Sequence, residues 1–194
     1  WGHSGIWFLM LILGATGILI RPFMEMAPGY ADLIFGLTAE GLAVILSSIG
    51  AGAMVSSLWL ARRGRTEGLV RLTTGSFALL AAVLFLFTLT DSIVLAVPLL
   101  FLYGYCMLIT GTAAQSLMQN AAAPEMRARA VSFFILLNWG TPAIGALAMG
   151  WIASYLGLQV TIAGGAVLGL LFWLWSHFAG KRHVDQLEGK KAEN

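Results

Sequence analysis

Long apolar runs alternate with short polar connectors along the chain. A helix needs about 20 mainly apolar residues to cross a bilayer, and windows of that length predict six spans. They cover residues 5–27, 40–60, 72–90, 92–117, 130–154 and 158–178. Closed barrels also satisfy the backbone in hydrocarbon, but runs such as LLAAVLFLF at 79–87 lack the alternation of barrel strands. The pattern therefore predicts an all-α membrane protein whose six transmembrane helices occupy residues 1–179.

The two ends of the chain carry further expectations. The segment 180–194, GKRHVDQLEGKKAEN, is polar and mixed in charge, so we interpret it as a cytoplasmic polar tail. The first span has no basic residue ahead of its apolar run, unlike a cleavable signal peptide, and we expect it to remain as a helix. Because Trp1 stands directly ahead of this span, we also expect the chain to be part of a longer protein.

The positive charges are sorted between alternate connectors. Ten of the 11 Lys and Arg residues follow the second, fourth or sixth span, and the other connectors contain none. These ten are Arg62, Arg63, Arg65, Arg71, Arg127, Arg129, Lys181, Arg182, Lys190 and Lys191. Positively charged loops stay in the cytoplasm. The distribution predicts a multi-pass protein of the inner (plasma) membrane with both termini cytoplasmic.

Composition excludes several other classes of protein. The chain is 59% hydrophobic and only 10% charged, which leaves too little polar surface for a soluble domain of 194 residues. We expect the lipid bilayer as its surroundings and no nucleic-acid partner, because the net charge of +2 arises from cations sorted by membrane side. The single cysteine, Cys106, excludes a disulfide scaffold or a zinc cluster. No metal site or cofactor is expected.

The eleventh cation, Arg21, lies inside the first span in the string RPFMEMAP at 21–28. Arg21 and Glu25 are four residues apart, so they share a helix face and can pair. Pro22 and Pro28 each remove an amide donor, which frees backbone carbonyls for a ligand or ion. Charges within a bilayer usually face a protein interior or a cavity, so one interpretation is a pair linked to substrate or protons. The alternative is that Arg21 extends to the outer headgroups with Glu25 beside it.

Other polar and small residues inside the spans also have two interpretations. The amides of Gln115 and Asn138 either line a cavity or form hydrogen bonds between helices. Small residues at helical spacing predict close helix packing, and prolines inside a span predict bends. The residues assigned to packing or bends are Pro22, Pro28, Pro142, Gly145, Gly150, Gly165 and Gly169.

One short string has a catalytic pattern. Gly2-His3-Ser4-Gly5 is similar to the GxSG string of rhomboid-type intramembrane serine proteases, and His177 is expected on the same membrane side. Ser4 stands at the chain start and His177 in a basic tail, which disfavours a buried serine–histidine pair. An intramembrane hydrolase that uses Ser4 is therefore kept as an alternative only.

Several motifs occur in an order that carries a family resemblance. The string RPFMEMAPGYAD at 21–32 combines an Arg-Pro, an acidic residue and a second proline. The run Arg62, Arg63, Gly64, Arg65 matches the Arg-x-Gly-Arg end of a loop motif whose Gly and Asp are replaced here by Ser57 and Ala61. Further along stand Pro124, Glu125, Arg127 and Arg129, followed by Pro142, Gly145 and Gly150. In this order the chain resembles the C-terminal six-helix half of a major facilitator superfamily transporter, in the branch of the enterobactin exporter and related secretion effectors.

The resemblance implies a secondary active transporter, not an enzyme, that exports a small organic molecule by alternating access with proton coupling. Its partners would be that substrate and the N-terminal six-helix half of the same transporter. A 3+3 inverted repeat would place spans one, two, four and five around the cavity. Within it, Glu25 would carry the proton, Arg21 would keep Glu25 ionised until substrate or motion separates them, and Arg62, Arg63 and Arg65 would contact acidic residues of the other half. A six-span scaffold or partner subunit that transports nothing is the remaining alternative.

Overall fold

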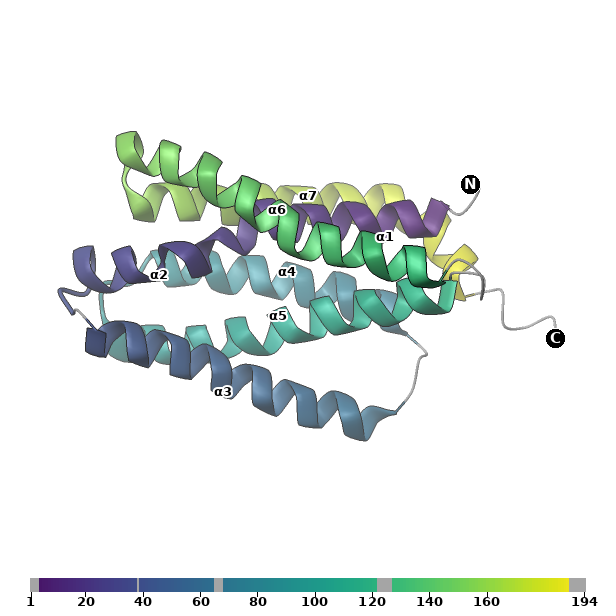
Figure 1. The fold of residues 1–194 in the computed structure, drawn as a ribbon, viewed down its shortest axis with the longest axis horizontal. Helices are drawn as coiled ribbons and strands as arrows, with labels where there is room; N and C mark the ends of the chain where they lie inside the picture. Colours follow the sequence, from purple (N-terminus) through teal and green to yellow (C-terminus); the bar gives the residue numbers. More distant parts are fainter. Residues whose placement is uncertain (1–3, 38, 65–67, 122–126, 189–194) are drawn as a thin grey trace.

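The computed structural model describes residues 4–37, 39–64, 68–121 and 127–188; within the helices, the side chains of 4–9, 121, 127, 130, 177 and 179–188 are outside this description. The described part is helical and contains six helices that are long and apolar enough to cross a membrane. The elements are α1 (Ser4–Ala15), the π-helix η1 (Thr16–Ile20), α2 (Pro22–Leu33), α3 (Ala39–Arg63), α4 (Leu69–Thr88), α5 (Ile93–Ala121), α6 (Arg127–Leu156) and α7 (Leu158–Glu188). The all-α membrane bundle predicted from the sequence is confirmed (Figure 1).

The first span consists of α1, η1 and α2 and continues to Leu33, beyond the expected end at 27. The helix passes through Pro28 because the residues that follow are buried: Tyr30 and Ala31 are 0% and 1% exposed. Tyr30 packs against the rings of Phe23 and Phe87 at centroid distances of 6.1 and 4.8 Å. At the other end of the chain, α7 continues to Glu188, into the segment expected as a polar tail.

Successive spans run in opposite directions. In Figure 1, α1 begins and α7 ends at the same end of the bundle, where α3 also ends and α4 begins. The turns from α4 to α5 and from α6 to α7 lie at the opposite end. The last of these turns is a single residue, Gly157, whose φ of +84° is accessible to glycine at low cost. The spans therefore alternate in direction, as the sorting of positive charges between alternate connectors predicts.

The helices pack in a chain of neighbours: α3 on α5, α5 on α4, and α4 on α7. The contact between α3 and α5 is close because it is made at glycines. A Cβ added at Gly52 would collide with the carbonyl of Phe101, and one added at Gly104 would collide with the carbonyl of Ile49. Small residues at a crossing let two helix backbones approach in this way.

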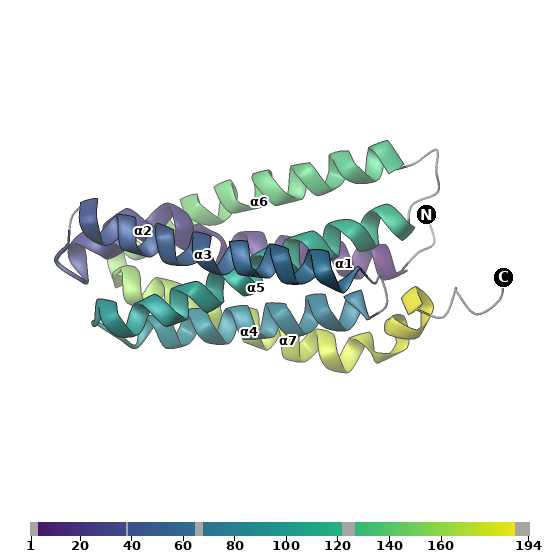
Figure 2. The same cartoon turned by 90° about the horizontal axis from the view of Figure 1, so that it is seen from below.

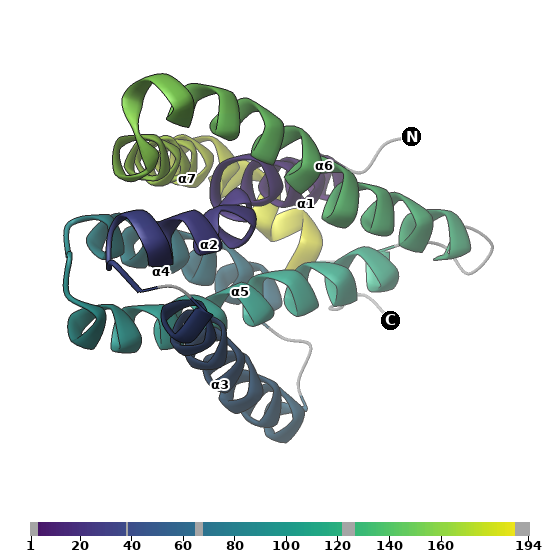
Figure 3. The ribbon, with the colours of Figure 1, turned by 60° about the vertical axis from the view of Figure 1, so that its left-hand side comes forward.

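The fifth span, α6, is the least buried helix, with only 11% of its hydrophobic window buried. Figure 2 shows it on one edge of the bundle, with α4 and α7 toward the opposite edge. A single stripe of α6 packs inward, on the first span, α5 and α7, and it consists of Phe134, Asn138, Thr141, Gly145 and Met149. The remainder of α6 presents large apolar side chains outward, such as Trp139 and Leu147. In Figure 3 the first span and α6 lie on one side of the bundle, and α5 and α3 lie on the other.

Candidate functional site

An open cavity of about 370 Å³ lies among four of the six spans. Its lining comes from the first span, α3, α5 and α6, and no described residue of α4 or α7 contributes. These are the spans that the family resemblance placed around a central cavity. The lining residues are Leu13, Thr16, Gly17, Arg21, Met24, Ile49, Ala53, Gly104, Met107, Leu108, Thr110, Gly111, Thr112, Gln115, Phe134 and Asn138.

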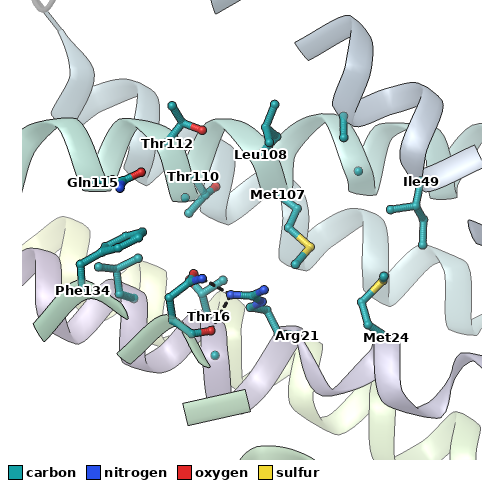
Figure 4. Close-up of a pocket in the computed structure, with 16 residues that line it drawn as sticks. Thr16, Arg21, Met24, Ile49, Met107, Leu108, Thr110, Thr112, Gln115 and Phe134 are labelled. Atoms are coloured by element: carbon teal, nitrogen blue, oxygen red, sulfur yellow. Dashed lines mark hydrogen bonds between the residues drawn. The ribbon is translucent and has the colours of Figure 1, made fainter. Parts of the chain in front are cut away.

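Arg21 is the one charged residue in this lining (Figure 4). It lies midway along the span Met10–Leu33, at about 18 Å from Leu33 at the helical rise of 1.5 Å per residue. Its Nη1 donates to the backbone carbonyl of Asn138 at 2.7 Å and to the Asn138 side-chain oxygen at 2.6 Å. The guanidinium carbon also lies 6.0 Å from the centroid of the Trp139 ring. The side chain therefore contacts α6 and does not extend along its own helix toward the headgroups.

The backbone ahead of Arg21 explains this placement. The amide of Arg21 donates to the carbonyl of Thr16 at 3.0 Å, one residue further back than in an α-helix, and this closes the π-helix η1. Pro22 has no amide hydrogen to donate to Ile18, the residue four positions earlier. Short π segments of this kind often occur at functional sites. The extra residue in the turn sets the direction in which Arg21 leaves the helix.

The carbonyls around this break are covered by other helices. Gly145 of α6 lies against the carbonyl of Ile18, and Gly165 of α7 lies against that of Leu19. The Tyr103 hydroxyl donates to the carbonyl of Ile20 at 3.3 Å. The expectation that Pro22 frees carbonyls for a ligand is thus corrected, because packing partners occupy these positions.

Glu25 lies outside the cavity lining and is exposed on the surface of the bundle. Among the described residues no ion pair joins it to Arg21, although the two are one helical turn apart. The reason is that Arg21 makes its hydrogen bonds to Asn138 on the neighbouring span. The structure therefore joins Arg21 to Asn138 by hydrogen bonds, and Glu25 stays within electrostatic range of Arg21 without forming an ion pair with it.

Gln115 lies in the lining, further along α5 from Met107 (Figure 4). Two hydroxyls of the lining are directed back to their own helices. Thr16 donates to Ile12 at 2.7 Å, and Thr110 donates to Cys106 at 2.9 Å. The guanidinium of Arg21 is consequently the strongest donor group at the cavity wall.

The residues assigned to packing differ in their surroundings. Gly145, Gly165 and Gly169 contact the first span, and Pro142 lies beside Gly17. Gly150 has open space around it within the described part of the chain, because it is five positions beyond Gly145 and points roughly 140° further round the helix. Pro28 is exposed. Gly17 and Gly104 also lie at close helix crossings. Their spacing in the sequence did not identify them as packing residues.

The loop motif lies at the end of α3, away from the cavity lining. Arg62 and Arg63 are its last residues, and the Arg63 guanidinium lies 5.5 Å from the centroid of the Trp59 ring. Gly64 follows with a φ of +57°. Arg65 lies outside the described residues.

The structure does not describe the side chains on which the hydrolase alternative depends. Ser4 opens α1, and its side chain and that of His177 are both outside the description. Within the described residues, no group of three or more His, Cys, Asp or Glu side chains has the arrangement of a metal site.

Comparison with known proteins adds one match. Residues 33–193 match the family described as transmembrane secretion effector, a family of the major facilitator superfamily. The match covers α3 to α7 and begins beyond Arg21 and Glu25. Neither a curated protein nor a solved structure matches the chain significantly. The chain is a multi-pass membrane protein that belongs to the transmembrane secretion effector family of major facilitator superfamily transporters.

Proposed function

We propose that the chain is the C-terminal six-helix half of a secondary transporter that exports a small organic molecule across the inner membrane. The observation that carries this proposal is the cavity between the first span, α3, α5 and α6, with Arg21 bound to Asn138 at its wall. The cavity is open at the surface of the six-helix bundle. A second six-helix half placed over this opening would complete a binding chamber near the bilayer midplane, as in transporters built from repeats.

The close packing around the cavity suits movement of the six-helix half as one unit. The first span and α6 contact each other at Gly17 and Gly145, and α3 and α5 contact each other at Gly52 and Gly104. The cavity lies between these two close pairs. Rocking of this half against the other six-helix half would change access to the cavity while each close contact stays intact, which is the basis of alternating access.

Proton coupling is assigned to Glu25. It is the acidic residue that lies within a described span and away from the ends; Asp32 and Glu40 lie at the ends of α2 and α3, and Asp91 lies in a connector. Its exposed position, one turn from Arg21, leaves it accessible to a covering half. A carboxylate in such a place can take up a proton on one side of the membrane and release it on the other.

Transport in inside-out membrane vesicles tests both parts of the proposal. The full-length protein, supplied with a proton gradient and a panel of labelled small organic compounds, should accumulate at least one compound in a gradient-dependent manner. Glu25→Gln should abolish gradient-driven accumulation and retain exchange of that compound at equal pH. Glu40→Gln is the matched control because Glu40 is exposed at the start of α3. Unchanged gradient dependence in Glu25→Gln would remove the proton assignment, and copurification of a partner with no flux of any compound would favour the scaffold.

A further inference from the structure

We propose that the Arg21 cavity binds a small organic anion, with a carboxylate on the guanidinium and an apolar aromatic body against the surrounding wall. This inference rests on the transporter proposal and names its substrate class. It is carried by the charge of Arg21, by its hydrogen bonds and by the apolar lining of the cavity around it.

The carboxylate within electrostatic range of Arg21 is that of Glu25, one turn away, which lies outside the cavity lining and makes no ion pair with Arg21. Arginine stays protonated in proteins, and a charge at the centre of a bilayer costs on the order of 2.5–3.5 kcal/mol even on insertion scales. Among the described residues, no acidic side chain forms an ion pair with Arg21. Its hydrogen-bond partner Asn138 is neutral, so Asn138 orients the guanidinium and leaves its positive charge for another group.

Within the described part of the chain, one nitrogen of the guanidinium makes hydrogen bonds. Nη1 donates to both oxygens of Asn138, and no described residue accepts a hydrogen bond from Nη2 or Nε. Those two nitrogens form one edge of the planar guanidinium, the edge that pairs with a carboxylate through two parallel hydrogen bonds. The arrangement is that of a fixed cation with one binding edge available toward the cavity that Arg21 lines.

The wall around this edge is apolar. Leu13, Met24, Ile49, Met107, Leu108 and Phe134 account for its large side chains. Methionine side chains adapt to aromatic rings and contact them favourably, and Met24 and Met107 lie on either side of the space next to Arg21 in Figure 4. The volume of about 370 Å³ is at the lower end of the ligand-pocket range. A compact one- or two-ring carboxylate fits these properties.

Calorimetric titration of the purified full-length protein in detergent tests the inference with three probes of equal size. They are 2-naphthoate, the neutral 2-naphthamide and the cationic 2-naphthylmethylammonium. We expect 2-naphthoate to bind about tenfold to a hundredfold more tightly than 2-naphthamide, as charge-assisted hydrogen bonds imply, and the ammonium compound not to bind. All three partition into micelles, so differences between protein variants report the cavity.

Three variants separate charge from structure. Arg21→Gln should lower 2-naphthoate affinity to that of 2-naphthamide. Asn138→Asp should do the same with folding retained, because the new carboxylate pairs with Arg21 in place of the ligand; a purely structural role for Arg21 predicts no loss in this variant. Arg71→Gln, exposed at the start of α4, is the matched control and should bind 2-naphthoate as the wild type does.

The outcomes distinguish this inference from the transporter proposal. Equal affinity for 2-naphthoate and 2-naphthamide, or a preference for 2-naphthoate that persists in Arg21→Gln or Asn138→Asp, overturns the anion site. Gradient-driven flux of neutral or cationic compounds alone keeps the transporter and removes the anion class. Binding of 2-naphthoate that depends on Arg21, without flux of any compound, keeps the site and removes the transporter.

Discussion

Tyr103 and Arg21 illustrate how single polar side chains are accommodated within the bundle. Both side chains lie beside the π-helix and donate hydrogen bonds to another span. Arg21 donates to Asn138 on α6, and Tyr103 on α5 donates to the carbonyl of Ile20. A polar group without a partner in an apolar interior costs about 1–3 kcal/mol or more. Interhelical hydrogen bonds at these residues avoid that cost and join the spans that carry them.

Replacement of Tyr103 by Phe tests the value of such a bond. Tyr103 is 1% exposed, and the substitution removes the hydroxyl that donates to the Ile20 carbonyl. We expect Tyr103→Phe to lower the free energy of unfolding by about 1 kcal/mol, measured by denaturant titration in detergent. Tyr155→Phe, at a position 73% exposed, should leave stability unchanged. Equal effects of the two variants would contradict a role for the Tyr103 bond.

At the scale of elements, helix crossings are set by glycines that have no room for a Cβ. Gly17, Gly145 and Gly165 hold the first span against α6 and α7, and Gly52 and Gly104 hold α3 against α5. In lipid the hydrophobic effect does not drive helices together, so such close contacts supply much of the association. The break at η1 adds to this because the carbonyls of Ile18 and Leu19 lie against glycines of neighbouring helices.

Alanine substitution distinguishes these glycines from others in the same helix. Gly52→Ala places a methyl group against the carbonyl of Phe101, so we expect a loss of about 1–3 kcal/mol as α3 and α5 are forced apart. Gly50→Ala, two residues away with open space around it, should be neutral or stabilise by up to about 1 kcal/mol through helix propensity. Thermal unfolding in detergent measures both. A Gly52→Ala variant as stable as Gly50→Ala would mean that the crossing is not a tight contact.

At the scale of the whole molecule, the antiparallel order of the spans places α1's start, the end of α3 and the start of α4 at one end of the bundle. The cavity lies between two helix pairs within it, while α4 and α7 stay outside the lining. Arg62 and Arg63 mark the first end, and Ser92 marks the opposite one. Because the spans alternate, the membrane side of one connector fixes the orientation of the whole bundle.

Cysteine labelling in intact cells locates that connector. With Cys106→Ser as background, we expect Ser92→Cys to react with a membrane-impermeant maleimide from outside. Arg62→Cys should react only after permeabilisation, because positively charged connectors stay in the cytoplasm. Both positions are exposed, whereas Cys106 is only 1% exposed. Labelling of both positions from the same side would contradict the topology, and reversed labelling would contradict the orientation.

Apolar length and the sorting of charges were sufficient to predict the six spans, their alternation and the class of protein, because a bilayer imposes these requirements on the local sequence. The partner of Arg21 was not predictable in this way. Helical spacing favoured Glu25, one turn away, whereas Asn138 is 117 positions distant and meets Arg21 only through the crossing of two spans. The π turn before Pro22 and the contacts of Gly145, but not Gly150, are likewise decided by packing. Sequence by itself therefore determined the number and alternation of the spans, and the tertiary structure decided which side chains form the cavity, since a side chain's neighbours depend on where distant helices cross.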